Sequence, residues 1–563
     1  MQRSLRLCVF TSKAPLEPGM IPELVDKRRG TVADPPGRST QDRTAAAVFA
    51  AIELAGFIFY VAAARNVWFF RDDWEFLAER RFNLHDLLAQ HGGHWVALPL
   101  AVYRAMYFVV GLRSYLPYQL MTIVLHLVAA LLLRAVMRRA GVSPWIATVV
   151  AGGYVFFGSG SQDVLWAFQI AFIGPLVLGL AQVLLADHDG PLCRRDWLGL
   201  VAGLAALMCS GVAVTMIGVV GLAVLIRRGW RPAAFHTVPL AAVYAGWWLH
   251  YARSSSTTVT SASELYDWFR TGLTAAFDAL GEVPLAGWAL AAMLTVGLVL
   301  AWRRQTVTEF RRYGGIPAAM LVGSAAFLVV SGVNRAWVGT QFAASSRYLD
   351  IIVALLLPAL AVAADALIRT WRASLPVVLL LLLIGIPGNV RATGGNFYNE
   401  RYFSDYEHMM RSLPRAALAQ RVPRDLRPEL TNAPWVTVGW LLDGAHSGRI
   451  PATSGSTPRE RATSVLRLSL YQVSGGTGSE CSPLSSPRIV DLATGDGFVV
   501  RGTITVQLIG DEPGTSSNPV TFGATFLGGS GNQTIRDVGG PLTIRIGGGQ
   551  SSPSLCGLPG HST

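Results

Sequence analysis

Several long stretches of this sequence carry almost no charge, and they limit the folds that the chain can adopt. The segments 351–364 (IIVALLLPALAVAA) and 375–387 (LPVVLLLLLIGIP) are apolar over most of a bilayer's thickness. A helix of about 20 such residues crosses a membrane, because the hydrocarbon core offers no hydrogen-bond partner to an open backbone. Hydrophobic residues make up 51% of the 563 residues and charged residues only 15%. We therefore predict a polytopic α-helical membrane protein embedded in a lipid bilayer.

The positive charge of the chain is explained by membrane topology. The formal net charge is +12, and arginine supplies nearly all of it, since lysine occurs only at Lys13 and Lys27. The arginines flank apolar segments on one side, as the positive-inside rule requires. No compact basic motif with interleaved aromatic residues occurs, so we expect no nucleic-acid partner.

The pattern predicts about eleven membrane crossings, with the N-terminus inside and the C-terminus outside. The count depends on segment 96–112, which is short and carries Arg104, and which we interpret as a helix lying at the membrane interface. With that choice, five later loops place their arginines on the side of the N-terminus. The predicted spans are 45–63, 117–133, 145–158, 164–186, 197–208, 211–226, 235–250, 284–302, 317–333, 351–368 and 375–388.

Three regions follow from this topology. Residues 1–43 are predicted to be a flexible cytoplasmic tail. Residues 44–388 form the transmembrane domain, whose first outer loop is 65–116, and residues 253–269 are interpreted as a flexible outer loop with an interfacial aromatic end. Residues 389–563 form an extracytoplasmic soluble domain on the outer face of the plasma membrane.

The soluble domain is predicted to begin with helix and to continue as a mainly β, sandwich-like fold. Segment 398–420 has helical character. Segment 503–509 (TITVQLI) alternates in the manner of a strand, and 520–527 and 542–546 continue this pattern between turn-forming residues. Cys481 and Cys556 both fall in this domain and are candidates for a disulfide if the compartment is oxidising.

The first outer loop carries an adjacent pair of carboxylates, Asp72 and Asp73, in the segment RDDW. Two neighbouring carboxylates repel each other, so one of them is a candidate general base with a raised pKa. A divalent cation such as Mg or Mn, bound through the carboxylate oxygens, is an alternative role. A helix cap or a solvated turn is the simplest interpretation of such a pair.

Three other polar segments lie in predicted outer loops. The first loop continues as HGGHWVALPL over 91–100, which contains His91 and His94. A later outer loop ends SSRYLD over 345–350. Asp163 stands at the entrance of a span, where it is a candidate for substrate contact, although capping of a helix together with Ser161 is the favoured interpretation.

These motifs together resemble the GT-C class of membrane glycosyltransferases, which includes protein O-mannosyltransferases, lipid A aminoarabinose transferases and mycobacterial arabinosyltransferases. Members carry an acidic residue or pair in the first outer loop, followed by interfacial helices, a histidine-containing segment and a late Arg-Tyr. The resemblance covers about 45–370 as architecture and three short motifs as sequence. It implies an inverting transfer of a sugar from a polyprenyl-phosphate donor to a hydroxyl of an envelope glycan, lipid or protein.

The resemblance also implies roles for individual residues. Asp72 or Asp73 would deprotonate the acceptor or hold a metal. Arg347, with Tyr348, would contact the donor phosphate, a task that suits the planar guanidinium because it binds phosphate oxygens in pairs. His91 and His94 would line the entrance to the site, and packing at the membrane interface beside Trp95 is the alternative for them. Arg104 or Arg113 would stand in for a lysine that some relatives use and that these outer loops lack.

Two other functional classes remain open at this stage. A transporter or flippase of lipid-linked glycans would have the same topology, although Glu53 is the only acidic residue near mid-depth of a predicted span and no internal repeat is evident. A non-enzymatic membrane protein whose outer domain binds an envelope polymer is the second alternative.

Overall fold

The protein divides into two compact units. The computed structural model describes residues 36–252, 260–395, 400–453, 455–476, 481–510, 512, 515–523, 532–548 and 553–557, so residues 1–35 of the predicted tail lie outside the described residues. The membrane unit comprises the described residues of Met1–Ala64, Leu88–Pro99 and Gln119–Phe397, and the β unit comprises those of Arg65–Leu87, Leu100–Tyr118 and Tyr398–Thr563. Most of the predicted first outer loop therefore belongs to the same unit as the C-terminal segment.

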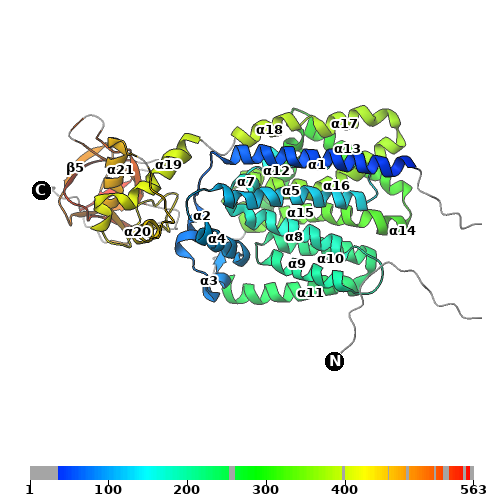
Figure 1. Cartoon of the computed structure of the whole chain (residues 1–563), viewed down its shortest axis with the longest axis horizontal. Helices are drawn as coiled ribbons and strands as arrows, with labels where there is room; N and C mark the ends of the chain where they lie inside the picture. Colours follow the sequence, from blue (N-terminus) through cyan, green and yellow to red (C-terminus); the bar gives the residue numbers. More distant parts are fainter. Residues whose placement is uncertain are drawn as a thin grey trace, which may run out of the picture. The chain divides into compact units, whose positions relative to one another are not determined.

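The membrane unit is a bundle of helices with one short hairpin (Figure 1). Each predicted span overlaps at least one helix of this bundle, and the last span overlaps both α17 and α18. The hairpin is β1 (Gln90–His91) and β2 (His94–Trp95), and the helices are α1 (Pro36–Ala64), α5 (Leu116–Arg139), α6 (Pro144–Val155), α7 (Gln162–Leu165), α8 (Ile170–Ala186), α9 (Arg194–Leu207), α10 (Val212–Arg228), α11 (Trp230–Trp247), α12 (Ala262–Gly281), α13 (Ala286–Arg304), α14 (Val307–Glu309), α15 (Gly315–Arg335), α16 (Ser346–Thr370), α17 (Leu375–Leu383) and α18 (Ile386–Gly395).

Seven helical stretches among the described residues are long and apolar enough to cross a membrane, so the chain is a multi-pass membrane protein. The count of eleven crossings and the inside position of the N-terminus stay predictions. The seven stretches are Thr40–Ala64, Leu116–Arg139, Ala167–Ala186, Ala286–Arg304, Val307–Val338, Ser346–Thr370 and Arg372–Thr393. Segment 96–112, predicted to lie at the interface, contains the 13-residue helix α4 (Ala97–Val109).

The arginine-bearing loops that were predicted on one side of the membrane are joined to one another at one end of the membrane unit. The contacts link Arg139 to Asp187, Arg227 to Asp187 and to the carbonyl of Arg312, and Arg369 to the carbonyl of Gly141. These contacts connect the loops that follow α5, α8, α10, α13 and α16. The alternation of the predicted loops between two ends of the bundle is therefore consistent with the helix arrangement.

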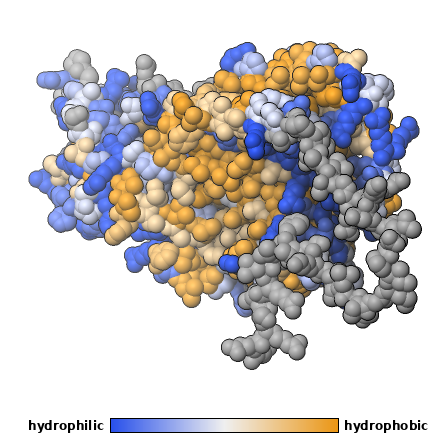
Figure 2. All heavy atoms as spheres, turned by 45° about the vertical axis from the view of Figure 1, so that its right-hand side comes forward, coloured by the Kyte–Doolittle hydropathy of each residue, from blue (hydrophilic) through white to orange (hydrophobic). Residues whose placement is uncertain are grey.

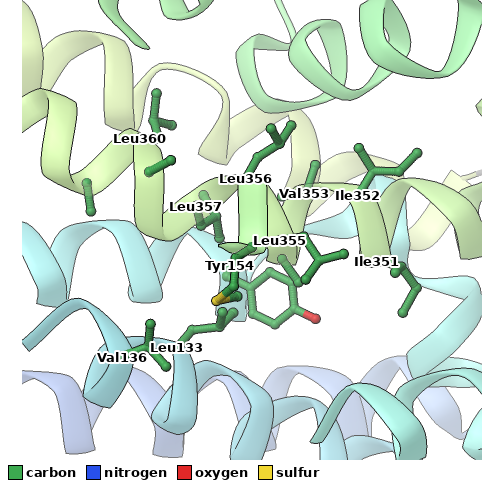
Figure 3. Packing of buried hydrophobic residues seen from close by; sticks show 14 of the residues in the cluster. Leu133, Val136, Tyr154, Ile351, Ile352, Val353, Leu355, Leu356, Leu357 and Leu360 are labelled. Atoms are coloured by element: carbon green, nitrogen blue, oxygen red, sulfur yellow. The ribbon is translucent and has the colours of Figure 1, made fainter. Parts of the chain in front are cut away.

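The centre of the membrane unit is α16, which is apolar on all sides and buried almost throughout. A helix without a polar face is stable in the core of a bundle or against lipid, and α16 packs here against α6, α13 and α15. Figure 3 shows Tyr154 of α6 beside the leucines of α16. The two aspartates of α16, Asp350 and Asp365, are nonetheless buried.

The helices at the periphery expose apolar side chains. Leu54 and Ile58 of α1 are each 61% exposed, and Leu380 of α17 is 60% exposed. The surface over the helices is broadly hydrophobic (Figure 2). Exposed apolar surface of this extent is stable against lipid rather than water, because lipid tails do not penalise it.

The segment that follows α11 differs from what the sequence predicted. The stretch 253–269 was predicted to be a flexible outer loop, and its part 253–259 lies outside the described residues. Its remaining part enters α12, which runs for 20 residues to Gly281. Ser261 accepts a hydrogen bond from the Glu264 backbone, and the Glu264 side chain accepts one from the Ser261 backbone, so a capping box starts this helix.

The β unit contains two antiparallel sheets whose inner faces share one hydrophobic core, as the mainly β prediction requires. The sheet orders are β5-β10-β7-β8 and β3-β9-β6-β11-β4. The strands are β3 (Leu470–Ser474), β4 (Cys481–Pro483), β5 (Arg488–Leu492), β6 (Gly497–Arg501), β7 (Thr503–Leu508), β8 (Val520–Gly523), β9 (Gln533–Asp537), β10 (Leu542–Gly548) and β11 (Ser554–Cys556). The helices of this unit are α2 (Asp72–Trp74), α3 (Leu84–Leu88), α19 (Glu400–Ser412), α20 (Val438–His446) and α21 (Pro458–Ser469).

The predicted strand patterns match this core. Ile504 and Val506 of β7 are both fully buried, and Leu508 packs against the same cluster, so the alternating residues share the inner face. The predicted strand 520–527 is seen as β8 up to Gly523, and 524–527 lie outside the described residues. Cys481 and Cys556 face each other across β4 and β11 and form a disulfide.

Candidate functional site

The acidic pair lies in a tight turn of the β unit. Arg71, which precedes the pair, has φ 50° and ψ −120°, a left-handed backbone conformation that costs a non-glycine residue on the order of 1–3 kcal/mol. Its backbone N–H donates to the carbonyl of Asn432 at 2.8 Å, which ties the turn to the C-terminal segment. The strained turn is thus held by contacts within the unit, and α2 begins immediately after it at Asp72.

Asp73 is buried in a set of hydrogen-bond donors. Its Oδ1 accepts from the Tyr103 hydroxyl, and its Oδ2 accepts from the Tyr115 hydroxyl at 3.0 Å and from the Phe70 backbone N–H at 3.0 Å. The side chain is fully buried. Burial raises the pKa of Asp73 to about 7, although these three hydrogen bonds act in the opposite direction. Asp73 therefore anchors the turn to α4 and to the chain before α5.

Asp72 differs from its neighbour because it is partly exposed. A general base must reach the proton that it removes, and Asp73, with both oxygens bonded inside the unit, does not meet that requirement. The structure thus separates the two carboxylates that the sequence left equivalent. Asp72 is the better candidate for contact with a substrate.

Aromatic packing fixes the turn within the β unit. The Trp74 ring lies 6.1 Å from the Trp440 ring, and the Trp440 ring stacks on the Tyr107 ring of α4 at 5.6 Å. Trp74 is fully buried. The first outer loop and helix α20, which are more than 300 residues apart in sequence, are therefore parts of one core.

Arg104 was predicted as a candidate phosphate ligand, and in the structure its guanidinium contacts other residues of the β unit. Its Nη1 donates to the carbonyl of Leu77 at 2.8 Å, and its guanidinium lies 5.6 Å from the Tyr107 ring centroid. Arg113, the alternative, is exposed.

The two predicted histidines lie in the membrane unit, paired across the hairpin β1–β2. Gly92 and Gly93 form its two-residue turn with φ 55° and 86°, backbone angles that suit a tight hairpin turn and that glycine adopts without strain. His91 packs against the Phe168 ring at 5.2 Å. His94 is packed tightly against α10, since a Cβ placed on Gly211 would lie only 2.8 Å from its Nδ1.

Two arginines lie within electrostatic range of His94. Burial first, and then the positive charges of Arg335, His91 and Arg347, lower the pKa of His94 to about 4. His94 is therefore neutral near pH 7. Arg335 also donates to the carbonyl of Gly92 at 3.2 Å, so it is positioned by the hairpin turn.

Arg347 lies against aromatic rings and within electrostatic range of an acidic residue, Asp163. Its guanidinium lies 5.6 Å from the Phe172 ring centroid and 5.2 Å from that of Tyr348. Its charge also acts on Asp163. Tyr348 itself is 7% exposed and packs among the rings of Trp268, Phe172 and Phe327, so it belongs to the core.

Asp163 does not cap a helix. No side-chain cap hydrogen bond is formed by Ser161 at the start of α7, and the carboxylate of Asp163 is fully buried instead. The favoured capping interpretation is thus wrong, because the helix buries this residue on its inner face.

The structure brings His91, His94, Arg347 and Asp163 into one region of the membrane unit, whereas Asp72, Asp73 and Arg104 belong to the β unit. The sequence analysis missed Arg335 as a possible phosphate contact, since it follows an apolar segment and looks like an ordinary flanking charge. Arg335 could have been identified from its position in the same outer loop as the Arg-Tyr motif.

Comparison of the chain with protein-family models, with curated proteins and with solved structures found no match.

Proposed function

We propose that this chain is a glycosyltransferase of the GT-C type that uses a polyprenyl-phosphate sugar and acts in the cell envelope. The observation that carries the proposal is that Arg335 and Arg347 both act electrostatically on His94 in a membrane-embedded bundle, and that Arg335 donates to the hairpin turn next to this histidine. Two guanidinium groups within electrostatic range of a neutral imidazole make a cationic site that suits a phosphodiester. The hydrophobic surface of the bundle suits the polyprenyl chain of the same donor (Figure 2).

In this proposal, Arg347 holds the donor phosphate and Arg335 adds a second positive charge. A carboxylate takes the proton of the acceptor hydroxyl, a role for which Asp72 is the candidate, and the hydroxyl oxygen attacks the anomeric carbon. The bond between the anomeric carbon and the phosphate oxygen breaks, and the electron pair leaves with the polyprenyl phosphate. The arginines stabilise the charge that develops on this leaving group. The new glycosidic bond has inverted configuration, because a single displacement occurs.

A divalent cation bound jointly by Asp72 and Asp73 is not favoured by the geometry. Both oxygens of Asp73 already accept hydrogen bonds from Tyr103, Tyr115 and the Phe70 backbone. Hard cations such as Mg require several oxygen ligands at short distance, and Asp73 is turned toward these donors instead.

The proposal places the β unit outside the cytoplasm, facing the outer side of the plasma membrane. The disulfide between Cys481 and Cys556 supports this, because such bonds persist in oxidising compartments. The acceptor is an envelope glycan, lipid or protein.

Transfer from radiolabelled polyprenyl-phosphate sugars in membranes tests the proposal. Wild type is compared with Asp72→Asn and with Asp405→Asn, a matched control that alters an exposed aspartate of the same unit. We expect transfer in wild type and in the control, and loss of transfer in Asp72→Asn at equal expression. Full activity of Asp72→Asn would refute the role of Asp72 as the base. Absence of transfer from every donor in all three proteins would refute the proposed glycosyltransferase activity.

A transporter of lipid-linked glycans is the second candidate, and one observation favours it. Asp163 and Asp350 are both fully buried in the membrane unit. Ionisable residues inside a membrane bundle commonly mark ion or substrate pathways. Reconstituted vesicles that move a fluorescent lipid-linked sugar without chemical change would support this alternative.

A further inference from the structure

Asp163 and Asp350 lie together inside the membrane unit. Both side chains are fully buried, and the charge of Asp350 acts on Asp163. The backbone before α7 packs closely on the second carboxylate, since a Cβ placed on Gly160 would lie 2.7 Å from Oδ1 of Asp350. Asp163 follows Gly160 by three residues. The short segment that packs against Asp350 therefore also carries Asp163.

The two carboxyl groups have fewer hydrogen bonds than buried carboxylates require. Oδ2 of Asp350 accepts from the Tyr154 hydroxyl at 3.0 Å. Oδ1 of Asp350 and both oxygens of Asp163 accept no hydrogen bond from any residue in the described part of the chain. Most buried polar atoms in proteins have a partner, so three orphaned oxygens in one cluster demand an explanation.

The charges around the cluster do not balance if both carboxyl groups are ionised. Among the residues that the structure describes, the ionisable groups that face it are Tyr60 of α1, Tyr154 of α6 and Arg347 of α16, and the His126 ring of α5 packs on the two tyrosines. Arg347 is the one cation in this set, because the phenols are neutral. Burying an uncompensated carboxylate costs several kcal/mol, so a second positive charge is required.

Burial raises the pKa of Asp163 well above its ordinary value, and the charge of Asp350 raises it further, while Arg347 acts in the opposite direction. A proton is the cation that needs the fewest ligands. It converts one carboxylate into a hydrogen-bond donor and leaves the other as its acceptor, as in paired carboxyl groups that titrate together.

We propose that Asp163 and Asp350 form a buried proton-binding site in which the two carboxyl groups share one proton at neutral pH. With that proton in place, Asp163, Asp350 and Arg347 carry no net charge together. Loss of the proton gives the same three groups a net charge of −1. Proton binding therefore controls how strongly this region attracts an anion.

The coupling to an anion rests on the proposed function, whereas the proton site does not. If Arg347 holds the donor phosphate, the bound phosphate and the shared proton stabilise each other. An anion then binds more tightly as the pH falls, by at most tenfold for each pH unit, because one proton is linked.

Infrared spectroscopy of the purified full-length chain in lipid nanodiscs tests the proton site. A protonated carboxyl group away from water has a carbonyl stretch that is distinct from the bands of carboxylates. We expect this band at neutral pH in wild type and in Asp267→Asn, which alters a half-exposed acid of the same unit. The band should be lost or shifted in Asp163→Asn and in Asp350→Asn.

Identical carbonyl bands in wild type and in both folded variants would overturn the proton site. A second measurement tests the coupling with a dodecyl methyl phosphodiester, a probe whose own charge does not titrate near neutral pH. Its affinity should weaken with rising pH in wild type and be independent of pH in Asp163→Asn. Probe binding that is independent of pH in wild type as well would overturn the coupling. Absence of probe binding at every pH would count against the proposed donor site, and it would not affect the infrared test of the proton site.

Discussion

Replacement of Asp73 by Asn should stabilise the β unit at alkaline pH and leave its stability unchanged in acid. Burial raises the pKa of Asp73 from an ordinary 3.8 to about 7. The folded protein therefore keeps a proton that the unfolded chain releases between these two pH values. A carboxyl group with a raised pKa contributes stability that is fully present below its unfolded pKa and is lost as the pH rises through its folded pKa.

The size of this effect follows from the shift. A difference of about three pKa units, at about 1.4 kcal/mol for each unit, corresponds to a loss of about 4 kcal/mol in the free energy of unfolding. The amide of Asn keeps an oxygen for the Phe70 backbone N–H and for a tyrosine hydroxyl, and it carries no charge at any pH. Asp73→Asn should therefore equal wild type near pH 4 and exceed it by up to about 4 kcal/mol above pH 8.

Unfolding of the full-length chain in lipid nanodiscs, followed by tryptophan fluorescence from pH 4 to pH 9, measures this difference. Trp68 and Trp74 report locally, because their rings lie 5.5 Å apart in the same core as Asp73. The exposed-site variant Asp405→Asn should follow the wild-type profile. Parallel profiles for wild type and Asp73→Asn, or a less stable Asp73→Asn at high pH, would refute the reasoning, since they would mean that the ionised form is the one the fold requires.

Three further predictions concern the other contacts. Gly211→Ala should reduce transfer more than it reduces folding, because its Cβ would lie 2.8 Å from the Nδ1 of His94; transfer rate and melting temperature measured side by side check this. Arg347→Lys should weaken binding of the phosphodiester probe although it keeps the charge, because lysine has no planar fork, and titration of the probe measures the loss. Reduction of the disulfide between Cys481 and Cys556, which are 75 residues apart, should cost about 4 kcal/mol of stability, and unfolding with and without reductant tests this.

Most of the helical architecture could be predicted because local sequence patterns determine it. Uncharged runs of span length fix the helices, and the arginines between them fix which loops lie together. The alternation in β7 likewise fixes its inner face. Helix α12 was missed because it carries charged residues and has no long apolar run, although the Ser261–Glu264 capping box was the available signal.

The site could be predicted only in part, because its geometry depends on distant contacts. Which aspartate of the pair is buried is decided by Tyr103 and Tyr115, which are 30 and 42 residues away from Asp73. Asp350 was seen as the end of a motif, and its pairing with Asp163 joins segments that no local pattern connects. Periodicity reports which face of a helix is buried, but it does not report which polar residue meets another inside.

The two candidate functions make different demands on the buried pair, so the pair also discriminates between them. A transporter that is driven by protons must release its proton on each cycle, and Asp163→Asn would then abolish transport. An enzyme needs the proton only to adjust the charge beside Arg347, so Asp163→Asn should keep transfer and lose the pH dependence of donor binding. Retained transfer with pH-independent donor affinity would assign the proton site to the enzyme, and loss of lipid movement with unchanged lipid chemistry would assign it to a transporter.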